Sequence, residues 1–142
     1  MFNKILVANR GEIACRVIKT ANKMGIKTVA VFSDADRHAL HVQMADEAIH
    51  IGASPANQSY IDIEKVVSAA KSSGAEAVHP GYGFLSENSK FAKALTKAKI
   101  AFIGPPQGAI ESMGDKITSK QIAQDAGVST VPGYMGLVNS AE

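Results

Sequence analysis

Hydrophobic and polar positions along the chain follow two alternating spacings. Short continuous apolar runs, the first two at residues 5–8 and 28–32, are typical of strands that are covered on both faces. Between them, residues 11–24 carry an apolar side chain every three or four positions, which predicts a helix that ends at Gly25. Strands that alternate with helices in this way predict an α/β fold with a doubly wound, mainly parallel sheet.

The same spacings place the later elements of this sheet. Apolar runs predict three further strands, at residues 48–51, 75–78 and 100–103. An amphipathic helix that ends at Gly74 is expected between the first two of them. A second helix, with Ser86 as its N-cap, is expected between the last two.

The pattern changes in the last quarter of the chain. Two short helices are expected there, at residues 107–113 and 115–126, and the one candidate for a further strand lies near Val131. We therefore expect residues 1–105 to form a nearly complete domain. Residues 106–142 are expected to contain linker helices and the truncated start of a second domain.

Composition limits the class of protein. Of the 142 residues 46% are hydrophobic and 20% are charged, which allows one sizeable core and argues against disorder or a membrane protein. The N-terminus lacks the apolar stretch of a secretion signal. Fifteen basic and 13 acidic residues give a net charge of +2, which is too balanced for binding nucleic acid by charge alone. The lone Cys15 excludes an internal disulfide and suits the cytoplasm.

The loop after the first strand is a candidate ligand site, because ligands of open α/β sheets bind at the carboxyl ends of strands. A dinucleotide would require glycines spaced G-x-G-x-x-G here, but this loop contains Gly11 alone. Asp34, after the second strand, could bind an adenosine ribose, but without the glycines a nicotinamide site is set aside. Gly11 and Glu12 are better explained as a helix start, where a carboxylate stabilises the helix dipole.

The segment 79–88, His-Pro-Gly-Tyr-Gly-Phe-Leu-Ser-Glu-Asn, also leaves the carboxyl end of a strand. Gly81 and Gly83 remove the side chains on both sides of Tyr82, so that backbone N–H groups can approach a ligand closely. Tyr82 itself could cover a flat ring. The alternative is a tight turn whose aromatic side chains pack into the core, and the residues alone favour neither.

Lys116 is a third candidate for ligand binding. Asp115 is the expected N-cap of the last helix, which places Lys116 in the first turn against the positive end of the helix dipole. A lysine in that position could bind a phosphate group. A solvated lysine is the simpler explanation from this residue alone.

Two further groups of residues have simple structural explanations. His38 and His41 share a helical face but lack the further ligands that zinc requires. Arg16, Lys19 and Lys23 form a basic stripe on the first helix, which is a solvated surface or a contact with a partner subunit. In the second case the chain could be a stand-alone Rossmann-like binding or assembly module without catalysis.

Taken together, the motifs resemble the N-terminus of biotin carboxylase. The segments ILVANRGEIA, MADEA, HPGYGFLSEN, FIGP and MGDK occur in the order and spacing of that family, over essentially the whole chain. The segments CRVI and MAD look closer to the α chains of propionyl-CoA or methylcrotonyl-CoA carboxylases. The chain thus resembles the N-terminal domain of a biotin-dependent acyl-CoA carboxylase α chain of the propionyl-CoA or acetyl-CoA type.

The resemblance implies an enzyme. Biotin carboxylases are ATP-grasp ligases that use ATP, Mg²⁺ and bicarbonate to carboxylate biotin on a carrier domain, through carboxyphosphate. The resemblance implies that residues 1–105 are the Rossmann-like preATP-grasp domain and that Lys116 contacts the ATP phosphates. It also implies that Tyr82 and Gly83 line the biotin end of the site.

The resemblance further implies a set of partners and a location. The expected partners are a second copy of the chain in a homodimer, a biotin carboxyl carrier domain and a carboxyltransferase subunit. The expected location is the bacterial cytoplasm or, after processing in a eukaryote, the mitochondrial matrix.

The catalytic groups of that family, including the magnesium-binding carboxylates, are expected outside this chain. Phosphoryl transfer needs acidic residues that hold Mg²⁺ against the phosphates, and after Lys116 the sequence offers only Asp125 and Glu142. We therefore expect neither a catalytic residue nor a metal site here, and no tightly bound cofactor. The chain alone is expected neither to hydrolyse ATP nor to carboxylate biotin.

Overall fold

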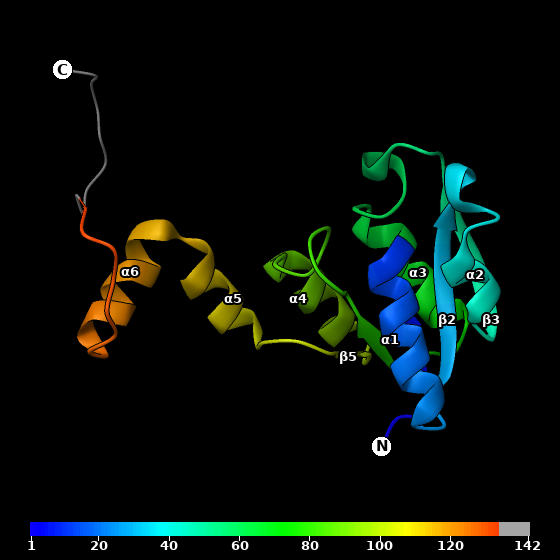
Figure 1. The fold of residues 1–142 in the computed structure, drawn as a ribbon, viewed down its shortest axis with the longest axis horizontal. Helices are drawn as coiled ribbons and strands as arrows, with labels where there is room; N and C mark the ends of the chain where they lie inside the picture. Colours follow the sequence, from blue (N-terminus) through cyan, green and yellow to red (C-terminus); the bar gives the residue numbers. More distant parts are fainter. Residues whose placement is uncertain (134–142) are drawn as a thin grey trace.

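The computed structural model describes residues 1–133, in which a five-stranded sheet carries helices on both faces (Figure 1). Every neighbouring pair of strands is parallel, and the strand order is β3-β2-β1-β4-β5. This confirms the predicted α/β fold with a doubly wound parallel sheet. The strands are β1 (Lys4–Val7), β2 (Lys27–Ser33), β3 (Glu47–Gly52), β4 (Ala77–His79) and β5 (Ala101–Phe102).

Apart from the short α2, the α-helices lie where the sequence predicts them. Two short 3-10 turns follow β2 and β3, at η1 (Asp34–Asp36) and η2 (Ala56–Gln58). The α-helices of the described part are α1 (Gly11–Lys23), α2 (Leu40–Met44), α3 (Ile63–Ser72), α4 (Ser89–Lys97), α5 (Gln107–Gly114) and α6 (Lys116–Asp125).

The expected N-cap of α4 is wrong by two residues. Asn88, rather than Ser86, precedes the first helical turn, and its side-chain oxygen accepts a hydrogen bond from the Phe91 backbone N–H at 3.1 Å. The Ser86 backbone N–H instead donates to the Gly83 carbonyl oxygen at 2.9 Å, which closes a turn ahead of the helix. Both residue types are good N-caps, so composition did not distinguish them.

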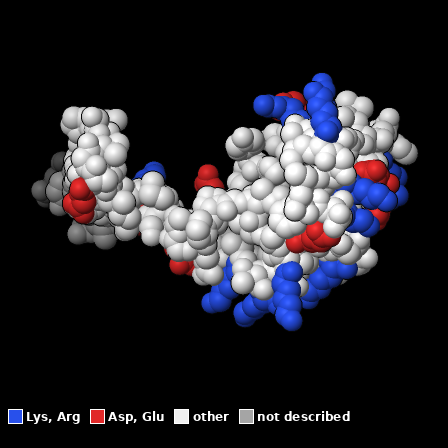
Figure 2. Space-filling view, turned by 90° about the horizontal axis from the view of Figure 1, so that it is seen from below, with Lys and Arg blue, Asp and Glu red and all other residues white. Residues whose placement is uncertain are grey.

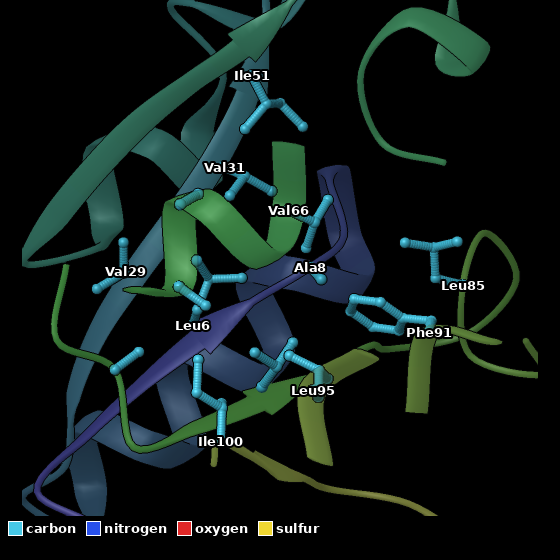
Figure 3. Close-up of a cluster of buried hydrophobic side chains, with 14 of the residues drawn as sticks. Leu6, Ala8, Val29, Val31, Ile51, Val66, Leu85, Phe91, Leu95 and Ile100 are labelled. Carbon is cyan, nitrogen blue, oxygen red and sulfur yellow. The ribbon is translucent and has the colours of Figure 1, made fainter. Parts of the chain in front are cut away.

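Apolar side chains are buried on both faces of the sheet, which explains why the strands are continuously apolar rather than alternating. On one face, Val7 of β1 packs with Ala14 and Ile18 of α1. On the other face, strand residues meet side chains of α3 and α4, as Figure 3 shows. The members of this larger cluster include Leu6, Val29, Val31, Val66, Phe91 and Leu95.

Helices α5 and α6 lead away from the sheet (Figure 1). The main contacts of α5 are with α4 and α6, and α6 has no buried residue. Residues 126–133 contain neither helix nor strand, so the candidate strand near Val131 does not form. Among the described helices, none combines the length and the apolar character needed to cross a membrane.

Candidate functional site

The winding direction of the sheet changes at β1, which lies between β2 and β4. In doubly wound sheets, the loops that follow such neighbouring strands diverge and leave a crevice in which ligands bind. Here, residues 9–13 after β1 and residues 82–84 after β4 line a cavity of about 410 Å³. We call it the switch-point cavity. It joins two loops that the sequence offered as separate candidates.

Asn9 ties these two loops together. Its side chain is buried, and its Nδ2 donates hydrogen bonds to the carbonyl oxygens of Pro80 (2.8 Å) and Tyr82 (2.9 Å). Its Oδ1 accepts a hydrogen bond from the Arg10 backbone N–H at 2.9 Å. Because both amide protons and the oxygen are used, the loop after β4 is fixed relative to the start of α1.

Gly81 makes this approach possible. Its φ of +64° is left-handed, and a Cβ at this position would lie 2.7 Å from Asn9 Nδ2 and 2.8 Å from Ile13 Cγ2. The Gly81 backbone N–H donates to His79 Nδ1 at 3.0 Å. The absence of a side chain at Gly81 therefore allows the close contact with Asn9. The Gly81 backbone N–H is already hydrogen-bonded within the loop.

Tyr82 and Gly83 form the outer rim of the cavity. The Tyr82 side chain is 74% exposed, and a Cβ added to Gly83 would meet no atom within 4 Å. The following Leu85 is buried, and Phe84 packs against the main core cluster. The two explanations of this loop thus apply to different residues: Phe84 and Leu85 pack inward, whereas Tyr82 is open to a ligand.

A second set of residues comes together without any sequence motif that indicates it. We call it the Arg10 cluster, and its members are Arg10, Asp36, Tyr60 and Phe84. The rings of Tyr60 and Phe84 are stacked, with centroids 5.1 Å apart and planes 6° apart. The Arg10 guanidinium carbon lies 5.4 Å from the Tyr60 centroid and 5.6 Å from the Phe84 centroid. Asp36 Oδ2 accepts a hydrogen bond from the Tyr60 hydroxyl at 2.7 Å and lies 3.4 Å from Arg10 Nη1.

Burial and hydrogen bonds set the charges of this cluster. Burial raises the pKa of Tyr60 to about 12, and the hydrogen bond to Asp36 acts in the same direction. Burial by itself would raise the pKa of Asp36, but hydrogen bonds from Tyr60, Ser33 and Arg10 outweigh it and hold that pKa below its usual 3.8. At neutral pH the cluster therefore contains a carboxylate, a neutral phenol and a guanidinium.

No local spacing indicates the Arg10 cluster, because its members come from four loops between positions 10 and 84. The one available signal was Phe84 in the Gly-Tyr-Gly-Phe segment. Phe84 adopts a φ of +44°, a left-handed conformation that costs a non-glycine residue about 1–2 kcal/mol. The stacking with Tyr60 offsets this cost.

Lys116 lies apart from the switch-point cavity. It is exposed in the first turn of α6, whose main contacts are with α5. Asp115 is the N-cap as predicted, because its Oδ1 accepts a hydrogen bond from the Thr118 backbone N–H at 2.7 Å. Of the three candidate residues, Tyr82 and Gly83 thus line the switch-point cavity, and Lys116 does not.

The other candidates of the sequence do not assemble into a metal site. His41 is completely buried, its Nε2 lies 3.3 Å from the Val31 carbonyl oxygen, and its Nδ1 has no hydrogen-bond partner among residues 1–133. Burial lowers the pKa of both His41 and His79. Over the same residues, no three His, Cys, Asp or Glu side chains come together in a group that could hold a metal ion.

Charges are mixed on the surface. Arg16, Lys19 and Lys23 are exposed along α1 as predicted, and Arg16 Nε lies 3.6 Å from Glu12 Oε1. On the face seen in Figure 2, Lys and Arg side chains gather around the edge of the part that holds the sheet, with Asp or Glu beside them at the top and right but not along the lower edge.

A larger apolar groove of about 580 Å³ runs between α1 and the sheet. Its walls include Ile5, Val17 and Ile103, and both His79 and Tyr82 line it as well. Tyr82 therefore lies between this groove and the switch-point cavity.

Comparisons with known proteins agree on one family. The family model for the N-terminal domain of biotin carboxylase matches residues 1–110. The propionyl-CoA carboxylase alpha chain of Ruegeria pomeroyi is 75% identical over 142 residues, which is 100% of this chain and 21% of that protein. The mitochondrial propionyl-CoA carboxylase alpha chain of Homo sapiens is 57% identical over 141 residues, 99% of this chain and 19% of that protein.

A solved structure extends this likeness to the fold. The biotin carboxylase domain of the Hydrogenobacter thermophilus 2-oxoglutarate carboxylase has a TM-score of 0.93 and 51% identity, over 99% of this chain and 31% of that one. It is a domain dimer in complex with MgADP, ADP and bicarbonate. The chain spans about a fifth of the length of the curated relatives that it matches.

Proposed function

We propose, since this chain belongs to the family of biotin carboxylase N-terminal domains, that it forms the N-terminal part of the biotin carboxylase component of an acyl-CoA carboxylase. That component would carboxylate biotin on a carrier domain, with ATP and bicarbonate as co-substrates. The 75% identity to the propionyl-CoA carboxylase alpha chain of Ruegeria pomeroyi, over the whole chain, carries this proposal.

In this proposal Tyr82 and Gly83 meet the biotin end of the active site. The exposed phenol ring of Tyr82 offers a flat face, and the absent side chain of Gly83 leaves the backbone open beside it. Asn9 keeps both residues in place through its hydrogen bonds to Pro80 and Tyr82. In this proposal these residues bind and orient the ligand.

Lys116 meets the ATP phosphates in this proposal. ATP supplies the phosphoryl group that activates bicarbonate, and an exposed ammonium at the start of α6 is a compact charge for a phosphate oxygen. Residues 1–133 do not fit a magnesium site, because they contain no group of three possible ligands. No catalytic step is therefore assigned to this chain.

We further propose three partners: a second copy of the chain, a biotin carboxyl carrier domain and a carboxyltransferase subunit. The dimeric arrangement of the Hydrogenobacter thermophilus domain supports the first of them. The bacterial and mitochondrial relatives support a location in the cytoplasm or the mitochondrial matrix.

A chimera tests the proposed function directly. The segment of the Ruegeria pomeroyi alpha chain that matches this sequence is replaced by this sequence, and bicarbonate-dependent biotin carboxylation is measured. We expect the chimera to be active. A chimera that folds and binds its partners but does not carboxylate biotin contradicts the proposal.

The same chimera tests Lys116. Lys116→Gln is expected to raise the KM for ATP about tenfold, because a charge-assisted bond to phosphate is lost, and to leave the KM for biotin unchanged. Lys120→Gln is the matched control, since Lys120 lies on the same helix. An unchanged KM for ATP in Lys116→Gln removes this residue from the site.

The 142-residue chain alone is expected to show no bicarbonate-dependent ATP hydrolysis, because its described residues offer no site for Mg²⁺. The measurement is phosphate release from ATP by the purified chain with and without bicarbonate. Phosphate release that depends on bicarbonate contradicts this expectation.

A further inference from the structure

We infer that Arg10 is a positioning residue: together with Asp36 and Tyr60 it holds Phe84, and through Phe84 it sets the conformation of the Tyr82–Gly83 rim. The inference rests on the proposed function only where it names biotin as the ligand of that rim. It assigns a role to the Arg10 cluster, which neither the sequence motifs nor the family membership explains.

The backbone of Phe84 is held in a strained conformation. A left-handed φ of +44° is unfavourable for phenylalanine, so this conformation persists only where the surroundings impose it. The surroundings are the ring of Tyr60, stacked at 5.1 Å, and the guanidinium of Arg10 at 5.6 Å from the Phe84 centroid. Tyr60 is almost completely buried and therefore provides a fixed surface.

The Arg10 guanidinium lies over both rings of the aromatic pair. The guanidinium carbon lies almost equally far from the two ring centroids, at 5.4 Å from Tyr60 and 5.6 Å from Phe84, and the two centroids are 5.1 Å apart. Asp36 provides the counter-charge and is itself held by Tyr60 and by the Ser33 hydroxyl, which donates to Asp36 Oδ2 at 3.0 Å. The guanidinium is thus engaged within the protein, which favours a positioning role over direct contact with substrate.

The backbone of the loop connects Phe84 to the rim. Gly83 precedes Phe84 directly, and its carbonyl oxygen accepts the hydrogen bond from the Ser86 backbone N–H at 2.9 Å. If Phe84 left its left-handed conformation, this turn would open, and Gly83 and Tyr82 would move with it. Asn9 holds the loop through the carbonyl oxygens of Pro80 and Tyr82. The Arg10 cluster holds the same loop at its other end, at Phe84.

Amide hydrogen exchange of the 142-residue chain tests the positioning role without any activity. In Arg10→Met, the Ser86 amide is expected to exchange about tenfold faster, because the turn opens more often. The Phe91 amide, which donates to Asn88 Oδ1, is the internal reference and is expected not to change. Phe84→Ala is the second variant: it removes the stacked ring and keeps the cost of the positive φ, so the same acceleration is expected.

Arg37→Met is the matched control. The Arg37 guanidinium also lies over an aromatic ring, 5.6 Å from the Phe32 centroid, and Arg37 Nη2 lies 3.8 Å from Asp34 Oδ1. It has the same kind of partners as Arg10 but does not line the switch-point cavity. The control is expected to leave the exchange of Ser86 unchanged.

The chimeric carboxylase then links the loop to its ligand. With free biotin as the probe, Arg10→Met is expected to raise the KM for biotin about tenfold and to leave the KM for ATP unchanged, since a displaced positioning loop affects one substrate. Arg37→Met is expected to change neither constant. An equal rise of both constants in Arg10→Met would indicate general loosening of the domain and would overturn the inference.

The two possible failures are distinguishable. Unchanged exchange of Ser86 in both Arg10→Met and Phe84→Ala overturns the positioning role, whatever the enzyme does. Faster exchange together with an unchanged KM for biotin supports the positioning role and contradicts the assignment of Tyr82 and Gly83 to biotin in the proposed function.

Discussion

Gly81 and the side chain of Asn9 touch so closely that residue 81 has no room for a methyl group: its Cβ would lie 2.7 Å from Asn9 Nδ2. This contact joins the loop after β1 to the loop after β4. The two loops, 72 positions apart, therefore act as one unit at the switch point, and the rim of the cavity depends on both.

Gly81→Ala is expected to lower the free energy of unfolding by roughly 2–4 kcal/mol, because the new methyl group must displace Asn9 and break its hydrogen bonds. Gly83→Ala is the matched control, since Gly83 has nearly the same φ of +65° but open space around it. The control is expected to cost only about 1 kcal/mol, for the left-handed conformation. Denaturant unfolding measures both, and equal losses would contradict the role of the Asn9 contact.

Tyr60 is expected to make the fold sensitive to alkali. Burial, reinforced by the hydrogen bond to Asp36, raises its pKa from the ordinary 10.0 to about 12. Because the folded state holds this proton more tightly than the unfolded chain does, the stabilisation is complete below pH 10 and is lost as the pH rises toward 12. The loss is about 3 kcal/mol for a shift of this size.

Unfolding curves between pH 8 and pH 12 measure this effect, and Tyr60→Phe is the comparison because it keeps the ring and removes the ionisable hydroxyl. The variant is expected to be less stable at neutral pH, by about 1–3 kcal/mol, since Asp36 loses its hydrogen bond. It is also expected to lose much of the alkaline slope. An identical slope in both proteins would show that Tyr60 does not cause it.

His41 is expected to contribute to acid sensitivity. Burial lowers its pKa below the ordinary 6.5, so the unfolded chain takes up a proton at a pH where the folded chain does not. The stabilisation is complete above pH 6.5 and is lost as the pH falls through the lower folded pKa. The slope for one such group reaches about 1.4 kcal/mol per pH unit.

His41→Leu is expected to reduce this acid slope, because the buried ionisable group is removed. His79 contributes in the same direction, since burial lowers its pKa as well, so part of the slope is expected to remain. Denaturant unfolding between pH 4.5 and pH 7 measures the difference. A variant with the unchanged slope would exclude His41 as a source.

Asn88 is expected to stabilise α4 as its N-cap. Asn88→Ala removes the acceptor for the Phe91 backbone N–H and is expected to cost about 1 kcal/mol. Ser86→Ala is the control, because Ser86 was the cap expected from the sequence and its side chain has no such bond to the helix in the described structure. Thermal unfolding of both variants separates the two assignments, and a larger loss in Ser86→Ala would reverse them.

The sequence by itself determined the order of the elements and the parallel sheet, because both follow from apolar periodicity, which is a local property of the chain. It also determined the family, through motifs that lie within single loops such as HPGYGFLSEN. The N-cap Asp115 was predictable for the same reason, since Asp115 accepts its hydrogen bond from the backbone N–H of Thr118, only three residues away.

Only the tertiary structure decided what those loops contact. The sequence suggested that Gly81 lets a ligand approach the backbone, whereas the structure shows Gly81 in close contact with the Asn9 side chain. The Arg10 cluster could not be predicted from the sequence, because Arg10 and Tyr60 meet only after the strands are placed side by side. No spacing along the chain indicates that contact. Side-chain packing between distant segments depends on the folded backbone, whereas periodicity and capping depend on neighbours within a few residues.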